Sequence, residues 1–402
     1  MTGAGTGHSR PCPVPGCGDI HEETLALLAQ QDLRLIPSAD LLAEREYCQR
    51  EIVAPDGPSQ SLLAHRLQII NGEIARRERL ARLGAPALPS QGSIPADMVA
   101  EVAKRSVSER VSYLEIMLTP DNGKSREAGR KLNWPSDAEL AKLSASELNA
   151  FFAKQREELL AGGILQPISP GVTSAVQETK AQLDQLETRL RDLLRCAEPS
   201  KAGPACQLTI RYVYQVARSL APREAFAQMV GAMEIMKADA RVVALNMVQA
   251  EDTRASMNNF PLQMKMLDYL HTVTEYKNGN VTLHAGELAP GLVPPEGLRF
   301  HIRDSVQLGH AKRIGHGVDV MYEDKPYELL KEMAAKNVLV EVCLTSNDGI
   351  LGVRGKEHPL SAYLKAGVPV ALATDDLGIS RSEMTQEYAK AIKDHGVDYR
   401  QL

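Results

Sequence analysis

Apolar, strand-like segments alternate with helix-like segments over the second half of the chain, and this alternation strongly restricts the fold. The strand candidates are residues 207–216, 241–249, 280–285, 312–317, 338–344 and 368–375, with an earlier one at 111–118. The helix candidates are 222–238, 261–276, 296–310, 325–337 and 359–366. Strands rich in Val, Ile and Leu on both faces are typical of a parallel sheet that is covered on each side. The sequence therefore predicts an α/β fold with helical crossovers.

A long segment at about 120–205 interrupts the alternation, and we expect it to be a mostly helical insertion. Its most regular part, 174–195, has leucines at helical spacing and is expected to act as scaffold. Cys196 and Cys206 bracket a loop that contains Gly and Pro. They either form a disulfide in an oxidising compartment or remain free thiols. Cys343 lies in an apolar run and is expected in the core.

The first hundred residues fit the alternating pattern poorly. Two segments, 22–34 and 60–84, indicate helices. The second of them contains four closely spaced arginines, Arg76, Arg77, Arg79 and Arg82. We interpret these arginines as a solvated helix face rather than a site for an anionic partner. The expected division is therefore a separate N-terminal region, 1–100, and an α/β region, 101–402.

Composition narrows the classes of partner. The chain has 402 residues and a net charge of −5, which argues against a nucleic-acid-binding surface but leaves a small nucleoside ligand open. No apolar stretch approaches the roughly 20 residues that cross a bilayer. The first residues lack the features of a secretory signal. Either the protein is cytoplasmic, or a signal for periplasmic or secreted location lies outside this sequence.

Three of the expected strands end in polar residues suited to metal binding or acid/base chemistry. His284 is followed by Glu287, His316 stands between two glycines, and Asp375 is adjacent to Asp376. The carboxyl ends of parallel strands are where a (β/α) barrel builds its active site. A neutral imidazole binds zinc well, and a nearby carboxyl group can act as a general acid. Two adjacent carboxylates repel unless a cation or a donor-rich ligand separates their roles.

Other polar residues allow two interpretations. The cluster Ser346, Asn347 and Asp348 either lines the pocket or forms a turn and a helix cap. His358 precedes a proline and is expected at the start of a helix. Three further histidines in helical stretches are expected to be structural or exposed: His271, His301 and His310.

Five motifs, in this order, resemble the adenosine deaminase family of metal-dependent amidohydrolase barrels. They are HAGE (284–287), RIGHG (313–317), EVCLTSN (341–347), HPL (358–360) and GVPVALATDD (367–376). The segments YLEIMLTP (113–120) and VVALNMVQAED (242–252) match in kind and order. The resemblance is strong over about 240–395, weaker over 100–240 and faint before 100. It implies a (β/α)8 TIM-type barrel.

The resemblance also implies a metal site and a reaction. One Zn²⁺ per chain would be held by His284 and Asp375, and Asp375 would also orient the water that attacks the substrate. Glu287 would be the acid that protonates N1 of the purine, and His316 the base that takes a proton from the water. The reaction would be hydrolytic deamination of adenosine or 2'-deoxyadenosine to inosine or 2'-deoxyinosine.

The same resemblance places two residues around the purine base. Asp376 would share a hydrogen bond at N7, and Gly286 would lie beside the base. Gln249 stands near the position where the family often has a glycine that contacts the purine, and the resemblance does not assign that contact to it.

The sequence departs from the family near its N-terminus. The family has a His-x-His pair on its first strand, and this chain has no such pair. One alignment places Pro13 and Pro15 at these positions, and another places His21 and Glu23 there. We therefore expect a barrel that is incomplete at its N- and C-terminal ends. Two alternatives stay open: a catalytically impaired member that binds a purine nucleoside, and a deaminase for another amino-purine.

Overall fold

The structure is a computed structural model, and it describes residues 93–277, 279–380 and 382–400. All of them belong to one compact unit, Pro86–Leu402. The helices expected at 22–34 and 60–84, the arginine cluster and the alternative pair His21 and Glu23 lie outside the described residues.

Parallel strands form the centre of this unit. In chain order they are β1 (Tyr113–Leu118), β2 (Thr209–Ala217), β3 (Val242–Val248), β4 (Thr282–Ala285), β5 (Arg313–His316), β6 (Leu339–Val342) and β7 (Val370–Leu372). They pair in sequence order as β1-β2-β3 and β4-β5-β6-β7, and all pairings are parallel. A parallel bridge between Leu245 and Val281 connects the two sheets. Each strand lies within or close to a segment that the sequence predicts.

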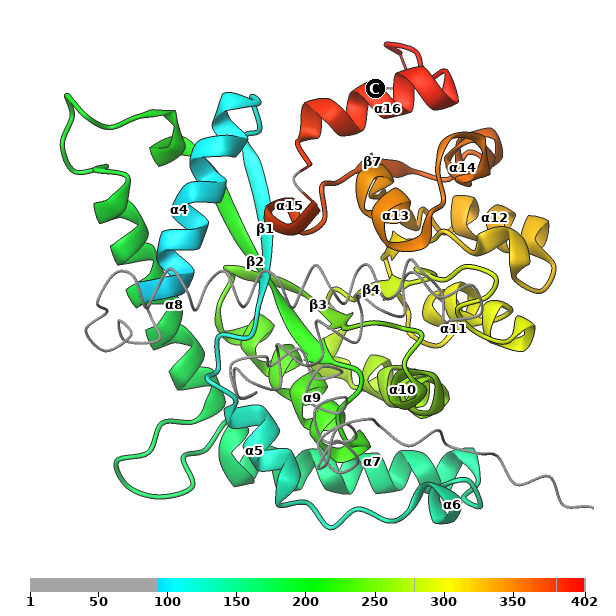
Figure 1. Cartoon of the computed structure of the whole chain (residues 1–402). Coiled ribbons are helices and arrows are strands. Elements are labelled where there is room, and N and C mark those ends of the chain that lie inside the picture. Colours follow the sequence, from blue (N-terminus) through cyan, green and yellow to red (C-terminus); the bar gives the residue numbers. More distant parts are fainter. Residues whose placement is uncertain (1–92, 278, 381, 401–402) are drawn as a thin grey trace, which may run out of the picture. The chain divides into compact units, whose positions relative to one another are not determined.

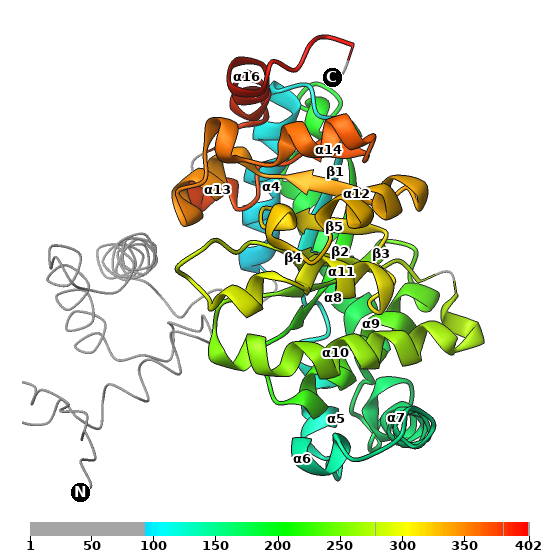
Figure 2. The ribbon, with the colours of Figure 1, turned by 90° about the vertical axis from the view of Figure 1, so that its right-hand side faces the viewer.

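Helices follow the strands and cover their outer side. They include α9 (Pro222–Ala238), α10 (Arg254–Thr272), α11 (His301–Gln307), α12 (Pro326–Ala335) and α14 (Leu360–Ala366). Figures 1 and 2 show α10, α11, α12 and α14 one after another along one side of the strands. Shorter segments complete the C-terminal part: α13 (Leu344–Leu351), α15 (Leu377–Ser380) and α16 (Met384–His395). This alternation confirms the parallel α/β fold of the TIM type.

The barrel is not closed by backbone pairing within the described residues, where β1 and β7 each pair with one neighbour only. The sheet is nevertheless strongly curved. Arg313 on β5 contacts Glu115 on β1, although these strands are not neighbours, and its Nη1 lies 3.0 Å from Glu341 on β6. A side chain can make these contacts only across the concave side of the sheet.

The predicted helical insertion is present between β1 and β2. It contains α5 (Lys124–Arg130), α6 (Asp137–Leu140), α7 (Ala145–Leu159) and α8 (Ala175–Leu193). α7 and α8 each begin with a serine whose side chain caps the helix in a capping box, Ser144 and Ser174. α8 packs against α4 (Ser93–Ser108) through a small apolar cluster, next to which Cys196 and Cys206 form a disulfide. Of the two alternatives for these cysteines, the structure therefore contains the disulfide.

The helix predicted at 261–276 begins seven residues earlier than expected. Thr253 accepts a hydrogen bond from the Ser256 backbone amide and caps α10 at Arg254. Pro261, at which the expected helix begins, lies inside α10. The cap at Thr253 therefore determines where the helix starts.

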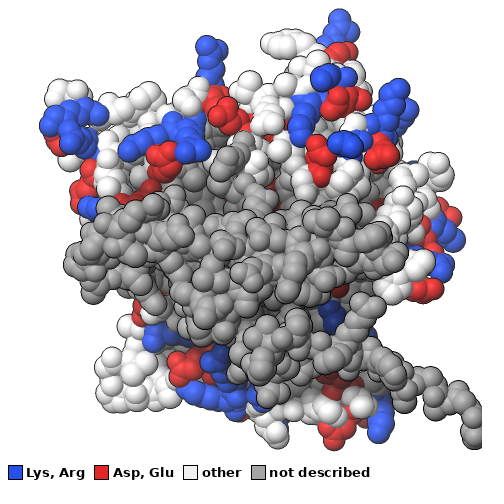
Figure 3. Space-filling view, viewed as in Figure 1, with Lys and Arg blue, Asp and Glu red and all other residues white. Residues whose placement is uncertain are grey.

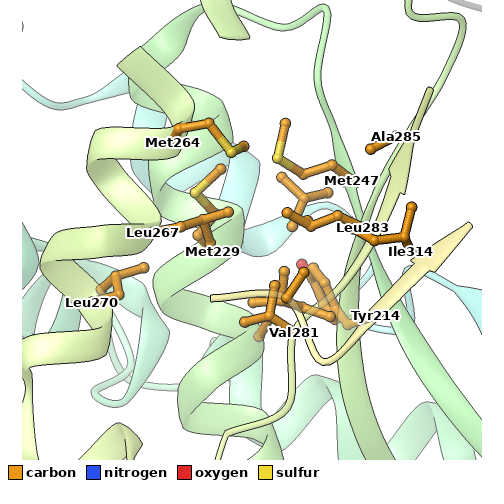
Figure 4. Packing of buried hydrophobic residues seen from close by; sticks show 14 of the residues in the cluster. Tyr214, Met229, Met247, Met264, Leu267, Leu270, Val281, Leu283, Ala285 and Ile314 are labelled. Atoms are coloured by element: carbon orange, nitrogen blue, oxygen red, sulfur yellow. The ribbon is translucent and has the colours of Figure 1, made fainter. Parts of the chain in front are cut away.

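The core between the helices and the strands contains several flexible methionines. Figure 4 shows Met229 of α9 and Met264 and Leu267 of α10 facing Met247 of β3 and Leu283 of β4. All five side chains are buried in one apolar cluster. Burying each such side chain stabilises the fold by about 1.5–3 kcal/mol. This packing fixes the strand ends that carry the candidate site.

Figure 3 shows the distribution of charged side chains on one face of the molecule. On its described part, basic and acidic side chains are interspersed, without a broad positive region. Among the described helices, none has the length and apolar character required to cross a membrane.

Candidate active site

The HAGE and RIGHG motifs meet at the carboxyl ends of two neighbouring strands. In the register of β4 and β5, Ala285 pairs with His316. The Nε2 atom of His284 lies 3.1 Å from a carboxylate oxygen of Glu287. The Nδ1 atom of His316 lies 3.3 Å from the other oxygen of that carboxylate. One ligand atom from each of these three residues lies within 4.8 Å of the other two.

Several site residues have a left-handed backbone at the strand ends. The φ angles are 71° at His316, 55° at Asp375 and 79° at Gly286. A non-glycine residue in this conformation costs about 1–3 kcal/mol and persists only when its surroundings enforce it. Gly317, with φ 59°, leaves space for the Tyr363 hydroxyl, which donates to the Gly317 carbonyl at 2.6 Å. The glycines of both motifs therefore permit close packing behind the site.

A buried ion pair lies behind His284, and the sequence analysis did not identify it. An oxygen of Glu251 lies 2.9 Å from Nδ1 of His284, and the same carboxylate accepts the backbone amides of Gly286 and Glu287 at 3.0 and 3.1 Å. Arg218 Nη1 lies 3.6 Å from Glu251, and its other terminal nitrogen donates to the His284 carbonyl. The sequence signal for this ion pair is Glu251, a carboxylate that follows the strand 242–248. The contact of Glu251 with His284, however, depends on the tertiary fold.

The charges around His284 suit a cation. Burial lowers the pKa of His284, but hydrogen bonds to Glu251 and Glu287 outweigh it and raise the pKa to about 10. Burial likewise disfavours the charged form of Glu251, yet Arg218 and His284 hold its pKa well below the usual range. The two carboxylates therefore favour the charged form of the imidazole.

The donor set fits zinc. Imidazole and carboxylate groups are common zinc ligands, and a carboxylate behind a ligating histidine, as Glu251 lies behind His284, is typical of such sites. Such a site would take up the ion with release of the proton from His284.

The two adjacent carboxyl groups differ in pKa. Burial raises the pKa of Asp375, but His316 and the hydroxyl of Ser346, which donates at 2.6 Å, bring it below its ordinary value. Burial, followed by repulsion from Asp375 and Glu287, raises the pKa of Asp376 to about 6. Asp375 is thus ionised where Asp376 can still hold a proton. Among the described residues, the cluster of His284, Glu287 and His316 does not include Asp375.

The segment after β6 lines the site rather than forming an exposed turn. Ser346 and Asn347 lie in the first turn of α13 and are buried. The side-chain nitrogen of Asn347, Nδ2, lies 3.0 Å from Nδ1 of His316 and 3.4 Å from a carboxylate oxygen of Glu287. Asp348 instead faces Lys390, at 3.7 Å. Ser346 and Asn347 therefore line the site, as one interpretation predicts, whereas Asp348 does not.

The remaining histidines fall into two groups. His358 precedes α14, as predicted, but its Nε2 atom also lies 3.2 Å from the Asn347 side-chain oxygen. His301 is buried with its ring 4.5 Å from that of Phe260. His310 stacks on His271, away from β5's carboxyl end, which agrees with a structural or exposed role.

The side chain of Gln249 is directed to the chain after β2. Its oxygen accepts the backbone amide of Ser219 at 3.1 Å, and its own φ is 84°.

Comparison with known proteins agrees with this architecture. The sequence model described as adenosine deaminase matches residues 94–402. The chain therefore belongs to the adenosine deaminase family. An adenosine deaminase of Clostridium perfringens is 35% identical over 120 residues, which are 30% of this chain and 33% of that protein. An adenosine deaminase of Clostridium botulinum is 30% identical over 157 residues, which are 39% and 43% of the two chains. The chain thus matches less than half the length of these relatives.

Solved structures show the same fold at lower similarity. The crystal structure of Arabidopsis ADAL complexed with GMP has a TM-score of 0.50 and 17% identity, and covers 94% of this chain and 84% of that chain. The complex of Arabidopsis ADAL with IMP has a TM-score of 0.50 and 18% identity, with 94% and 83% covered.

Proposed function

We propose that this protein deaminates a purine nucleoside, adenosine or 2'-deoxyadenosine, by zinc-dependent hydrolysis to inosine or 2'-deoxyinosine. The observation that carries the proposal is the convergence of His284, Glu287 and His316 at the carboxyl ends of β4 and β5. Family membership and relatives named adenosine deaminase support it.

The metal would be held by His284 and Asp375, with Glu287 and His316 beside them. A bound Zn²⁺ would supply water of lowered pKa for attack at C6 of the purine. The carboxylate of Glu251 keeps the ring of His284 oriented through Nδ1, so Nε2 faces the site.

Two carboxyl groups would recognise the purine edge. Glu287 would deliver a proton to N1, which makes C6 a better electrophile. Asp376, whose pKa is raised to about 6, would share a hydrogen bond with N7. Gly286 would let the base approach the backbone, since no side chain stands there. By the resemblance, His316 would be the base that takes a proton from the attacking water. The hydrogen bonds of its two ring nitrogens determine whether the ring can accept that proton.

The experiment combines metal analysis with turnover. Zinc per chain would be measured by elemental analysis, and deamination would be followed by the loss of adenosine's ultraviolet absorbance. We expect about one zinc per chain and a turnover that Glu287→Gln abolishes while zinc stays bound. His310→Gln, which changes a histidine outside the site, should preserve both. Protein that takes up no zinc and turns over no adenosine would overturn the proposal, and turnover of adenine or a nucleotide instead would identify another amino-purine as substrate.

A further inference from the structure

We propose that His358 and Asn347 are positioning residues that fix the proton of His316 on its Nε2 atom. They form a one-way chain of hydrogen bonds that starts at the Leu360 backbone amide and ends at His316 and Glu287. The catalytic meaning of this chain rests on the proposed function of the site, but the proton's location does not.

The first step fixes the tautomer of His358. The backbone amide of Leu360 donates to Nδ1 of His358 at 3.2 Å. A backbone amide can only donate, so this nitrogen must present its lone pair. The neutral ring then carries its hydrogen on Nε2.

His358 is held in its neutral form. The residue is 2% exposed. Burial, together with repulsion from His395 and His316, lowers its pKa to about 3. A charged ring would have hydrogens on both nitrogens and would face the Leu360 amide with a second donor.

The second step fixes the orientation of the Asn347 amide. Its oxygen lies 3.2 Å from the Nε2 atom of His358, which is a donor. The opposite orientation would place an NH₂ group against that N–H. Asn347 is fully buried, so solvent cannot compensate such a clash.

The third step fixes the proton of His316. The NH₂ group of Asn347 lies 3.0 Å from Nδ1 of His316 and has no acceptor capacity. Nδ1 of His316 must therefore accept, and its neutral ring carries the hydrogen on Nε2. The other hydrogen of the same NH₂ group is directed to Glu287, at 3.4 Å.

This arrangement changes the role that the resemblance gives to His316. A ring with its hydrogen on Nε2 and its Nδ1 lone pair engaged by Asn347 has no free lone pair for a proton from water. His316 acts instead as a hydrogen-bond donor to the oxygen that attacks the substrate, where negative charge develops. The proton of the water then passes to a carboxylate of the site.

The test locates the ring protons by nitrogen NMR on metal-free protein labelled at histidine, under mildly alkaline conditions. The resonances of His316 and His358 would be assigned from variants that lack each ring. In the wild type, we expect both rings as the Nε2–H form. In Asn347→Leu and Asn347→Asp, which remove the donor, the hydrogen of His316 should move to Nδ1. There it can donate to Glu287, 3.3 Å away.

A matched control changes a neighbouring histidine outside the chain of bonds. The ring of His395 lies 5.9 Å from that of His358, and His395→Gln should leave His316 in the Nε2–H form. Asn347→Asp has the same shape as asparagine and keeps the test valid if Asn347→Leu fails to fold. A wild-type His316 with its hydrogen on Nδ1, or a tautomer that does not respond to either variant, would overturn the inference.

Kinetics provides a second readout if the protein is active. Loss of a partner that orients a site residue typically lowers activity about 10–100-fold. We expect Asn347→Asp to lower kcat by this factor with little change in KM. An inactive wild type would refute the proposed function but would leave the NMR result intact.

Discussion

Replacement of Gly286 by alanine tests the close packing behind the HAGE motif. The residue has φ +79°, and a Cβ atom there would lie 2.5 Å from Oδ1 of Asp319 and 2.8 Å from the side chain of Ile302. Both neighbours are fully buried, so neither can swing into solvent. Gly286→Ala therefore combines backbone strain with a steric clash.

The two contributions can be separated by a control. Gly367 has φ +74°, and a Cβ there meets nothing within 4 Å. Gly367→Ala should lower the free energy of unfolding by about 1–2 kcal/mol for the left-handed backbone. Alanine also restricts the unfolded chain, which offsets about 0.4–1 kcal/mol at both positions. Overpacking adds about 1–3 kcal/mol at Gly286 alone.

The assay is urea unfolding of both variants and the wild type, with the slopes compared as a test of two-state behaviour. We expect Gly286→Ala to be less stable than Gly367→Ala by about 1–3 kcal/mol. Equal losses for both variants would refute the reasoning, because the backbone conformation alone would then explain them. A larger loss for Gly367→Ala would refute it as well.

Three further perturbations have expected outcomes. Glu251→Gln should lower the pKa of His284 from about 10 in metal-free protein, as followed by NMR titration, because one of its two carboxylate partners loses its charge. Burial raises the pKa of Glu323 to about 7. The folded chain then binds this proton more tightly than the unfolded chain. The wild type should therefore lose stability as the pH rises from about 4 to about 7. Glu323→Gln should lose less over that range in urea unfolding. Reduction of the disulfide between Cys196 and Cys206, 10 residues apart, should lower the free energy of unfolding by about 2–3 kcal/mol. A midpoint of urea unfolding that does not change in reductant would contradict this expectation.

Periodicity predicted the elements well where local signals and burial agree. The helix expected at 222–238 coincides with α9, which begins with a proline at its first position. The predicted start of α10 at residue 261 was wrong, because the helix begins at Arg254, directly after its cap at Thr253. The sequence itself contains this capping signal, a threonine just before the helix.

The candidate site was predictable in part. His284, Glu287 and His316 follow two strands that the sequence indicates, and neighbouring parallel strands bring their carboxyl ends together. The contributions of Glu251 and Arg218 could not be read locally, because they act through contacts with His284 from other strands. Their charges become meaningful only once β2, β3 and β4 lie side by side.

The ion cluster on the concave side of the sheet has a consequence for sequence change within the family. Arg313 joins Glu115 of β1 to Glu341 of β6, and all three side chains are largely shielded from solvent. Loss of the arginine alone would leave two carboxylates facing each other without a cation, which is more damaging than loss of the whole cluster. Relatives should therefore exchange these three positions together, either as a charged set or as an apolar one, and single exchanges should be rare.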